Sequence, residues 1–164
     1  MIDKRVAILV VSDKASRGER EDKGGNIAGE LLQKYGFNIV EKRIVPDEKE
    51  KIIEVLKEWS DISNIPLIIT TGGTGVSPRD VTPQATKEVI EFEIPGIGEA
   101  MRARSLEITP HAMLSRAIAG IRKKSLIINL PGSPPGVKDN LLVVIPALEH
   151  AILKISGDQS ECVQ

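Results

Sequence analysis

Apolar residues are concentrated in short runs of strand length, and stretches with helical spacing lie between them. The runs at 6–11, 67–71 and 125–129 are rich in Val, Ile and Leu, which is typical of strands buried on both faces of a parallel sheet. The segment 37–45 alternates between apolar and polar residues and predicts a strand with one less buried face. The pattern therefore predicts an α/β fold whose four strands form a mostly parallel sheet.

Two helices are predicted between the first three strands. Ile27, Leu31 and Tyr35 recur at helical spacing after the first strand. A second helix is expected to begin with Asp47 as its N-cap and to carry an apolar stripe that ends at Trp59. Each strand is thus followed by a helix, which is the arrangement expected of parallel strands.

The second half of the chain has weaker helical signals. Thr82 and Pro83 are expected as the N-cap and first residue of a helix. The spacing of apolar residues predicts a further helix at 114–121 and a closing helix from Leu141 to Ile155, which Pro146 interrupts.

The third strand ends in a glycine-rich stretch, Thr70-Thr71-Gly72-Gly73-Thr74-Gly75, and we call residues 72–81 the glycine loop. Such a loop leaves backbone N–H groups free to hold phosphate. It is neither a P-loop, because no Gly-Lys-Ser/Thr follows, nor a dinucleotide fingerprint. Asp80 within the loop suggests a metal ion or a proton acceptor. The simpler alternative is a wide turn in which Asp80 makes an Asx-turn.

Polar residues follow all four predicted strands: Asp13, Asp47, Asp80 and Ser133. If these strands are parallel, their carboxyl ends share one edge, and ligands bind in the crevice there. Three carboxylates around a phosphate cradle would repel an anionic ligand unless a cation lay between them, so Mg²⁺ and a nucleotide are expected. Each residue also has a structural alternative, because Asp47 and Ser133 could cap helices and Asp13 could close a turn.

Composition adds limits to this interpretation. The 164 residues fit one domain, 1–164, and the formal net charge of −1 favours neither nucleic-acid nor membrane binding. The apolar run at 6–11 is too short for a signal peptide, so a cytoplasmic protein is expected. A single Cys162 in a polar tail and two distant histidines, His111 and His150, do not suggest zinc.

Several motifs resemble, in the same order, those of one known family. They are Ser12-Asp13, Val45-Pro46-Asp47-Glu48, Thr70-Thr71-Gly72-Gly73-Thr74-Gly75, Arg79-Asp80-Val81-Thr82-Pro83 and Asn129-Leu130-Pro131-Gly132-Ser133, with smaller matches at 22–24, 95–99 and 114–116. The family is that of the molybdopterin adenylyltransferases of the MogA type, related to MoaB proteins and to the G domain of gephyrin. The resemblance extends from Val6 to about Ile155.

The resemblance implies a MogA-like, three-layer α/β sandwich that assembles as a homotrimer. It implies a nucleotidyltransferase that moves AMP from Mg-ATP to the terminal phosphate of molybdopterin, releases pyrophosphate and hands its product to a molybdate-insertion enzyme. Asp47 and Asp80 match the family's functional aspartates and are expected to be catalytic and to bind Mg²⁺. The residues expected to bind substrate and phosphate are Ser12, Asp13, Thr71, Gly72, Gly73, Thr74, Gly75 and Ser133.

Two other interpretations compete with this one. A MoaB-like or scaffold-type module would bind molybdopterin without turning it over, and some MoaB proteins lack one or both acids, whereas this chain has Asp47 and Asp80. A nicotinamide-dependent dehydrogenase ranks last because Ser12-Asp13-Lys14-Ala15-Ser16-Arg17-Gly18 replaces the glycine fingerprint after the first strand.

Overall fold

The structure, a computed structural model, describes residues 1–161, and Cys162 lies outside the described residues. Six strands form one sheet in the order β2-β1-β3-β6-β5-β4. The strands are β1 (Arg5–Val11), β2 (Asn38–Val45), β3 (Leu67–Thr71), β4 (Phe92–Glu93), β5 (Ala119–Arg122) and β6 (Ser125–Leu130). β1, β2, β3 and β6 are parallel, and β4 and β5 complete the sheet as antiparallel strands.

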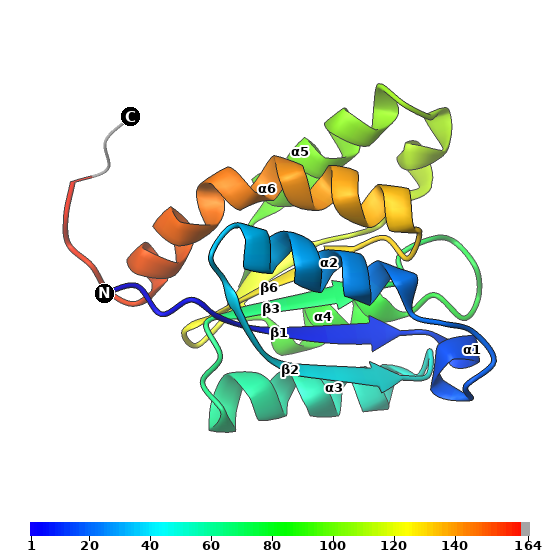
Figure 1. The fold of residues 1–164 in the computed structure, drawn as a ribbon, viewed down its shortest axis with the longest axis horizontal. Coiled ribbons are helices and arrows are strands. Elements are labelled where there is room, and N and C mark those ends of the chain that lie inside the picture. The colour runs from blue at the N-terminus through cyan, green and yellow to red at the C-terminus, as the bar shows by residue number, and fades with distance from the viewer. Residues whose placement is uncertain (162–164) are drawn as a thin grey trace.

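Helices cover both faces of the sheet, which confirms the three-layer α/β sandwich (Figure 1). They are α1 (Asp13–Ser16), α2 (Lys23–Lys34), α3 (Lys49–Lys57), α4 (Thr82–Val89), α5 (Pro95–Leu106) and α6 (Pro134–Ile155), with the π-helical turn η1 (Glu58–Ile62) after α3 and the 3-10 helix η2 (Pro110–Leu114) after α5.

Two apolar clusters lie between the layers because successive strand residues face opposite sides. Ile8 and Val10 of β1 pack with α2, α5 and α6, whereas Leu9 and Val11 pack with α3 and α4. The central strands are buried on both faces, as their apolar runs predicted. At the edge, β2 alternates between more and less exposed residues, as its sequence also predicted.

The prediction of a helix at 114–121 is wrong. Only Pro110–Leu114 is helical, as a 3-10 turn, and β5 follows it and forms a hairpin with β6. Ala117, Ala119 and Ile121 face one apolar cluster, so the true period is two rather than 3.6. The pattern was ambiguous because a short apolar stretch satisfies both spacings.

Several helix starts also differ from the prediction. Glu48 rather than Asp47 is the N-cap residue of α3, and Val81 rather than Thr82 is that of α4. The Thr82 hydroxyl instead donates a 2.9 Å hydrogen bond to the Gly72 carbonyl. The closing helix α6 begins earlier than expected, at Pro134, and includes Pro146 without a break.

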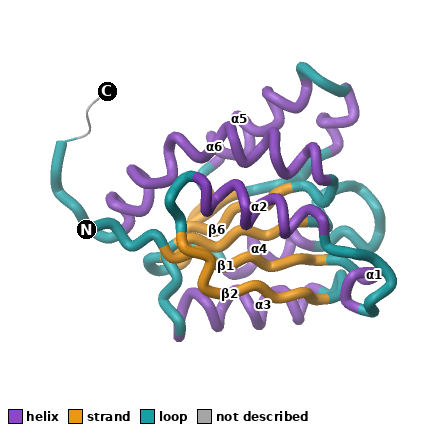
Figure 2. Tube along the Cα trace, viewed as in Figure 1, coloured by secondary structure: helices purple, strands orange, loops and turns teal. Residues whose placement is uncertain are grey.

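The parallel strands all end on one side of the molecule, where α1 and the connecting loops lie (Figures 1 and 2). This is the edge at which the sequence predicted a ligand crevice. Among residues 1–161, no helix is both long enough and apolar enough to cross a membrane.

A buried polar group joins the sheet to α4 just below the glycine loop. The Asn129 side-chain amide is fully buried and donates to the hydroxyls of Thr70, at 3.0 Å, and Thr86, at 2.9 Å. Its carbonyl oxygen accepts from the Ile118 backbone N–H at 3.3 Å. These bonds tie β3, β6, α4 and the segment before β5 together in an environment where unpaired polar groups are costly.

We expect Asn129→Leu to lower the free energy of unfolding by about 2–4 kcal/mol, because the buried hydroxyls of Thr70 and Thr86 lose their donor and the partly buried Ile118 N–H loses its acceptor. Urea denaturation measures the change. The matched control is Asn26→Leu on the exposed surface of α2, which should change stability by about 0.5 kcal/mol or less. Equal effects of the two substitutions would contradict the stabilising role of the buried network.

Candidate active site

A cavity of about 880 Å³ lies at the carboxyl edge of the sheet. Its walls come from the end of β1, the α1–α2 segment, the glycine loop and the start of α6. The lining residues are Val10, Val11, Ser12, Ala15, Arg20, Glu21, Asp22, Lys23, Gly24, Asp47, Thr71, Gly72, Gly73, Thr74, Gly75, Asp80, Gly132, Ser133 and Pro134. The volume is in the range of pockets that hold a small organic ligand.

The glycine loop passes very close to the end of β1. Gly72 has φ +92°, and a Cβ atom there would lie 2.3 Å from the Val11 carbonyl oxygen. Gly73 has φ +68°, and its Cβ would lie 2.3 Å from the Thr82 hydroxyl and 3.2 Å from Asp47 Oδ1. Only glycine fits these two positions, which is the physical reason for the Gly-Gly pair.

The loop presents backbone donors to the cavity. The N–H groups of Gly73, Thr74 and Gly75 have no hydrogen-bond acceptor within the described part of the chain. All three residues line the cavity. Unpaired backbone N–H groups at the end of a strand are suited to binding a phosphate.

Arg116, from the segment between η2 and β5, braces the far side of this loop. Its guanidinium donates to the carbonyl oxygens of Gly75 and Asp80, each at 2.7 Å, and its backbone N–H donates to Thr74 O at 2.9 Å. The sequence analysis included Arg116 only in a family motif and assigned it no role. No local pattern reveals this contact, because donor and acceptors are more than thirty-five residues apart.

Asp13 and Asp47 exchange hydrogen bonds across the ends of β1 and β2. The Asp13 N–H donates to Asp47 Oδ2 at 2.8 Å, and the Asp47 N–H donates to Asp13 Oδ1 at 3.0 Å. Arg79 of the glycine loop also donates to both Asp13 oxygens, at 3.0 and 2.9 Å. The second strand end thus meets the first through these two aspartates.

The three aspartates have different electrostatic surroundings. The hydrogen bonds from Arg79 hold the pKa of Asp13 below its ordinary value. Burial raises the pKa of Asp47, and the negative charges of Asp13 and Asp80 raise it further. Asp80 Oδ2 accepts the Ser77 N–H at 3.0 Å, so the predicted turn contact exists while the residue also lines the cavity.

The structure brings the expected site residues to one place, with one exception. All of them line the cavity except Asp13, whose carboxylate is taken up by Arg79 and Asp47. Ser133 lines it too, and its hydroxyl caps α6 by accepting the Gly136 N–H at 3.2 Å. Ser133 therefore caps a helix, as the structural alternative predicted, and also lines the cavity.

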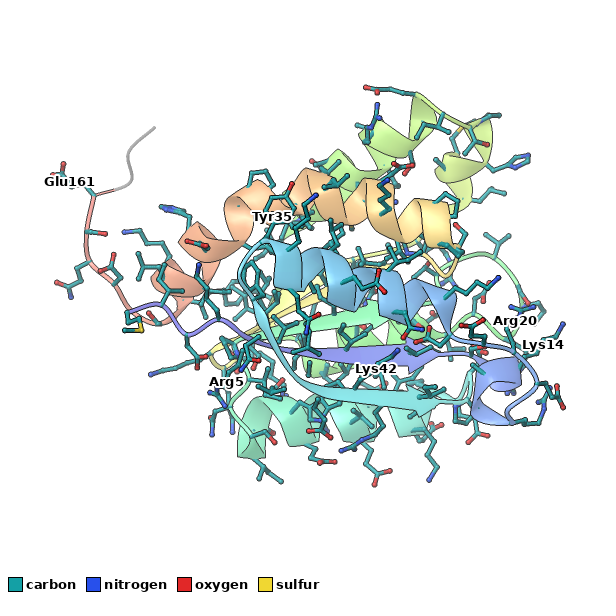
Figure 3. The ribbon with its side chains drawn as sticks, in the orientation of Figure 1. Arg5, Lys14, Arg20, Tyr35, Lys42 and Glu161 are labelled. Atoms are coloured by element: carbon teal, nitrogen blue, oxygen red, sulfur yellow. The ribbon has the colours of Figure 1, made fainter. Side chains whose placement is uncertain are left out.

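The segment that joins α1 to α2 forms part of the cavity wall, and none of its residues was expected at the site. Arg20 and Lys23 line the cavity, and Figure 3 shows Arg20 and Lys14 at the same end of the sheet. Asp22 caps α2 by accepting the Gly25 N–H at 2.8 Å and pairs with Lys42 at 2.6 Å. The clustering of charges at 19–23 was the available signal, but solvent-exposed charges give the same pattern.

The carboxylates left facing the cavity fit a magnesium ion that also binds phosphate. Residues 1–161 contain no group of three or more His, Cys, Asp or Glu that could hold a metal by itself. Four carboxylates line the cavity, Glu21, Asp22, Asp47 and Asp80, and Asp22 pairs with Lys42. Asp47 and Asp80 lie at the glycine-loop side, and neither forms an ion pair within the described chain. Mg²⁺ is commonly bound by one or two carboxylates together with phosphate oxygens. The two residues thus suit a cation that arrives with a nucleotide.

Comparison with known proteins agrees with this geometry. Residues 7–150 match the family model described as "Probable molybdopterin binding domain". A molybdopterin adenylyltransferase of Helicobacter pylori J99 is 44% identical over 93% of this chain and 88% of its own length. Gephyrin of Dictyostelium discoideum is 46% identical over 90% of this chain, which spans only 22% of gephyrin. A crystal structure of MoaB from Thermus thermophilus superposes with a TM-score of 0.88 at 46% identity, covering 96% of this chain and 98% of that chain.

Fold and cavity define a three-layer α/β protein with a crevice at the carboxyl edge of its sheet, lined by the glycine loop. The chain belongs to the molybdopterin-binding family of molybdenum cofactor biosynthesis, which includes MogA and MoaB proteins. The MogA-like fold implied by the sequence resemblance is confirmed.

The raised pKa of Asp47 predicts how this residue affects stability. A carboxyl group with a raised pKa binds its proton more tightly in the folded state, so its contribution to stability falls as pH rises above the ordinary pKa of 3.8. We expect Asp47→Asn to melt at a higher temperature than the parent at pH 7, because the neutral amide oxygen still accepts the Asp13 N–H. The difference should shrink toward about pH 4.

Differential scanning calorimetry between about pH 4 and pH 7, without added metal, measures this difference. Asp3→Asn is the control, because Arg5 lowers the pKa of Asp3 through a side-chain hydrogen bond. That substitution should lower the melting temperature at pH 7. A lower melting temperature for Asp47→Asn at pH 7 would contradict the assignment.

Proposed function

We propose that this protein is a molybdopterin adenylyltransferase, which transfers AMP from Mg-ATP to the terminal phosphate of molybdopterin and releases pyrophosphate. The observation that carries the proposal is the cavity in which two carboxylates, Asp47 and Asp80, face unpaired N–H groups of the glycine loop. Relatives that share 44% identity over most of the chain are molybdopterin adenylyltransferases. A location in the cytoplasm and hand-off to a molybdate-insertion enzyme belong to the same proposal.

The residues around the cavity suit a reaction between two anions. The N–H groups of Gly73, Thr74 and Gly75 hold one phosphate in place, which fixes its approach and offsets its charge. Asp47 and Asp80 would hold magnesium, and the bound ion would supply positive charge to neutralise the polyphosphate. A phosphate nucleophile needs little deprotonation near neutral pH, so these carboxylates are assigned as metal ligands rather than as general bases.

Arg20 and Lys23 also line the cavity, together with Glu21 and Asp22 of the same segment. The four formal charges sum to zero, so this wall offers a ligand cationic and anionic partners side by side rather than a uniformly positive surface.

The second candidate is a MoaB-like or scaffold-type module that binds molybdopterin without transferring AMP. The contact from Ser77 N–H to Asp80 Oδ2 favours it, because this bond gives Asp80 a structural purpose in the loop. The similarity to gephyrin and to MoaB points in the same direction. The two candidates differ in whether ATP is consumed.

The proposed homotrimer has support in the exposed apolar side chains near the end of α5. Leu106, Ile108, Met113 and Leu114 are large, apolar and exposed within one short segment. Figure 1 shows the end of α5 and the turn after it standing away from the sheet. Several large apolar side chains exposed within one short segment are typical of a protein interface.

Pyrophosphate release tests the enzyme proposal directly. We expect release from Mg-ATP only when molybdopterin is present, loss of release on adding EDTA, and recovery on restoring magnesium. Release that needs no metal would contradict the assigned metal ligands. No release with both substrates present would favour the binding module.

Asp80→Asn separates a metal ligand from a turn residue. The amide oxygen of Asn can still accept the Ser77 N–H, so folding should be nearly unchanged. Loss of one negative charge at the metal should lower the rate of AMP transfer by about 100-fold, or about 2.7 kcal/mol. Asp3→Asn, just before β1 and outside the cavity wall, is the control. Transfer at the parent rate would return Asp80 to a purely local role.

Light scattering tests the assembly. The purified protein should show about three times the chain mass of 17.8 kDa. Replacing Ile108 and Met113 with Lys should lower this mass without lowering the helical content measured by circular dichroism. A monomeric parent protein at micromolar concentration would overturn the trimer.

A further inference from the structure

Both oxygens of the Asp13 carboxylate, which was expected to bind substrate, accept hydrogen bonds from the protein. Oδ1 accepts the Asp47 N–H at 3.0 Å and Arg79 Nη2 at 2.9 Å, and Oδ2 accepts Arg79 Nε at 3.0 Å. Neither Asp13 nor Arg79 lines the cavity. Asp13 therefore interacts with the site through its neighbours.

The neighbour that matters is Asp47. The Asp13 N–H donates to Asp47 Oδ2 at 2.8 Å, so the two residues hold each other through both backbone and side chain. Asp47 Oδ1 remains on the side of the glycine loop, where a Cβ atom on Gly73 would lie 3.2 Å away. The exchange thus leaves one Asp47 oxygen for the cavity and fixes the other.

Arg79 completes this unit from the glycine loop. Its guanidinium presents two parallel donors to one carboxylate, a geometry that lysine cannot reproduce. The pair joins the glycine loop to the ends of β1 and β2, and it neutralises Asp13 beside Asp47. Without Arg79, Asp13 would lose its only ion-pair partner among the described residues and keep only the weaker attraction of Arg17, next to a partly buried carboxylate.

We propose that Asp13 and Arg79 act together as positioning residues that aim the Asp47 carboxylate into the cavity. The expected effect on catalysis rests on the proposed adenylyl transfer. The hydrogen bond that Asp13 accepts from the Asp47 N–H does not depend on that proposal. The competing possibility is that Arg79 leaves Asp13 and binds a phosphate directly. The two possibilities differ in whether Asp13 and Arg79 work as one unit.

The chain contains a matched control pair. Arg17 donates to both carboxylate oxygens of Glu19, each at 3.0 Å, and the Arg17 side chain is 57% exposed, compared with 59% for Arg79. Glu19 accepts no hydrogen bond from the ends of β1 or β2 within the described residues. Arg17→Gln therefore removes a pair of the same kind that makes no hydrogen bond to the side chain of Asp13 or Asp47, and it removes only a weaker charge attraction to Asp13.

A double-mutant cycle tests the unit. Arg79→Gln and Asp13→Asn should each lower kcat for AMP transfer by about 10-fold with little change in the KM for ATP, and the double variant should be no more than about twofold worse than either. Arg17→Gln should stay within about twofold of the parent. Additive losses, or a higher ATP KM for Arg79→Gln but not for Asp13→Asn, would overturn the proposal in favour of phosphate binding.

Hydrogen exchange supplies a readout that needs no activity. In Arg79→Gln the backbone amides of Asp13 and Asp47 should exchange about 10-fold faster by NMR, while Arg17→Gln should leave them unchanged. If the amides exchange faster in Arg79→Gln but the parent protein transfers no AMP, the proposed function is refuted and the coupling of Asp13, Arg79 and Asp47 is supported. Unchanged exchange, or faster exchange with unchanged kcat in an active enzyme, would refute the positioning role.

Discussion

The register of the parallel strands is the constraint on which the site depends. Val11 at the end of β1 pairs with Val45 at the end of β2, and Val10 pairs with Thr71, which in turn pairs with Leu130. Four strands therefore finish within about one residue of each other along the sheet. The polar residues that follow these strands therefore lie close together, because the strand pairing aligns the carboxyl ends at one edge of the sheet. A slip of one residue would also turn the buried strand faces over.

This dependence explains which parts of the fold the sequence could predict. The central strands are buried on both faces, so their apolar runs are long and unambiguous, and their carboxyl edge follows from the handedness of the connections. β5 was missed because it is short and antiparallel, and Ala117, Ala119 and Ile121 match a strand while nearby apolar residues also match a helix. The two-residue β4 carries too little pattern to be recognised.

The sequence predicted which residues lie at the site, but it did not predict which residues they contact. Residue order alone placed Asp47, Asp80 and the glycine loop at one edge, and the structure lines one cavity with them. The partners of these residues depend on contacts between distant segments. Arg79 pairs with Asp13 across sixty-six positions, and Arg116 braces Asp80 across thirty-six, so no local spacing could reveal either. Asp47 was assigned as a helix cap because capping and site residues share the same chemistry.

The three aspartates that look equivalent in sequence differ in what the fold does with their charge. Arg79 donates hydrogen bonds to both oxygens of Asp13 and lowers its pKa, so the charge of Asp13 stabilises the folded chain. Asp47 forms no ion pair among the described residues, and burial raises its pKa. Ionising this carboxyl group therefore costs more free energy in the folded protein than in the unfolded chain. A protein that only needed these loops closed could use a neutral side chain at Asp47, because an amide oxygen accepts the Asp13 N–H equally well. The fold therefore concentrates uncompensated negative charge beside a set of unpaired N–H donors. That combination is unfavourable in the empty site, and the cation and phosphate of the proposed reaction would offset it by entering together.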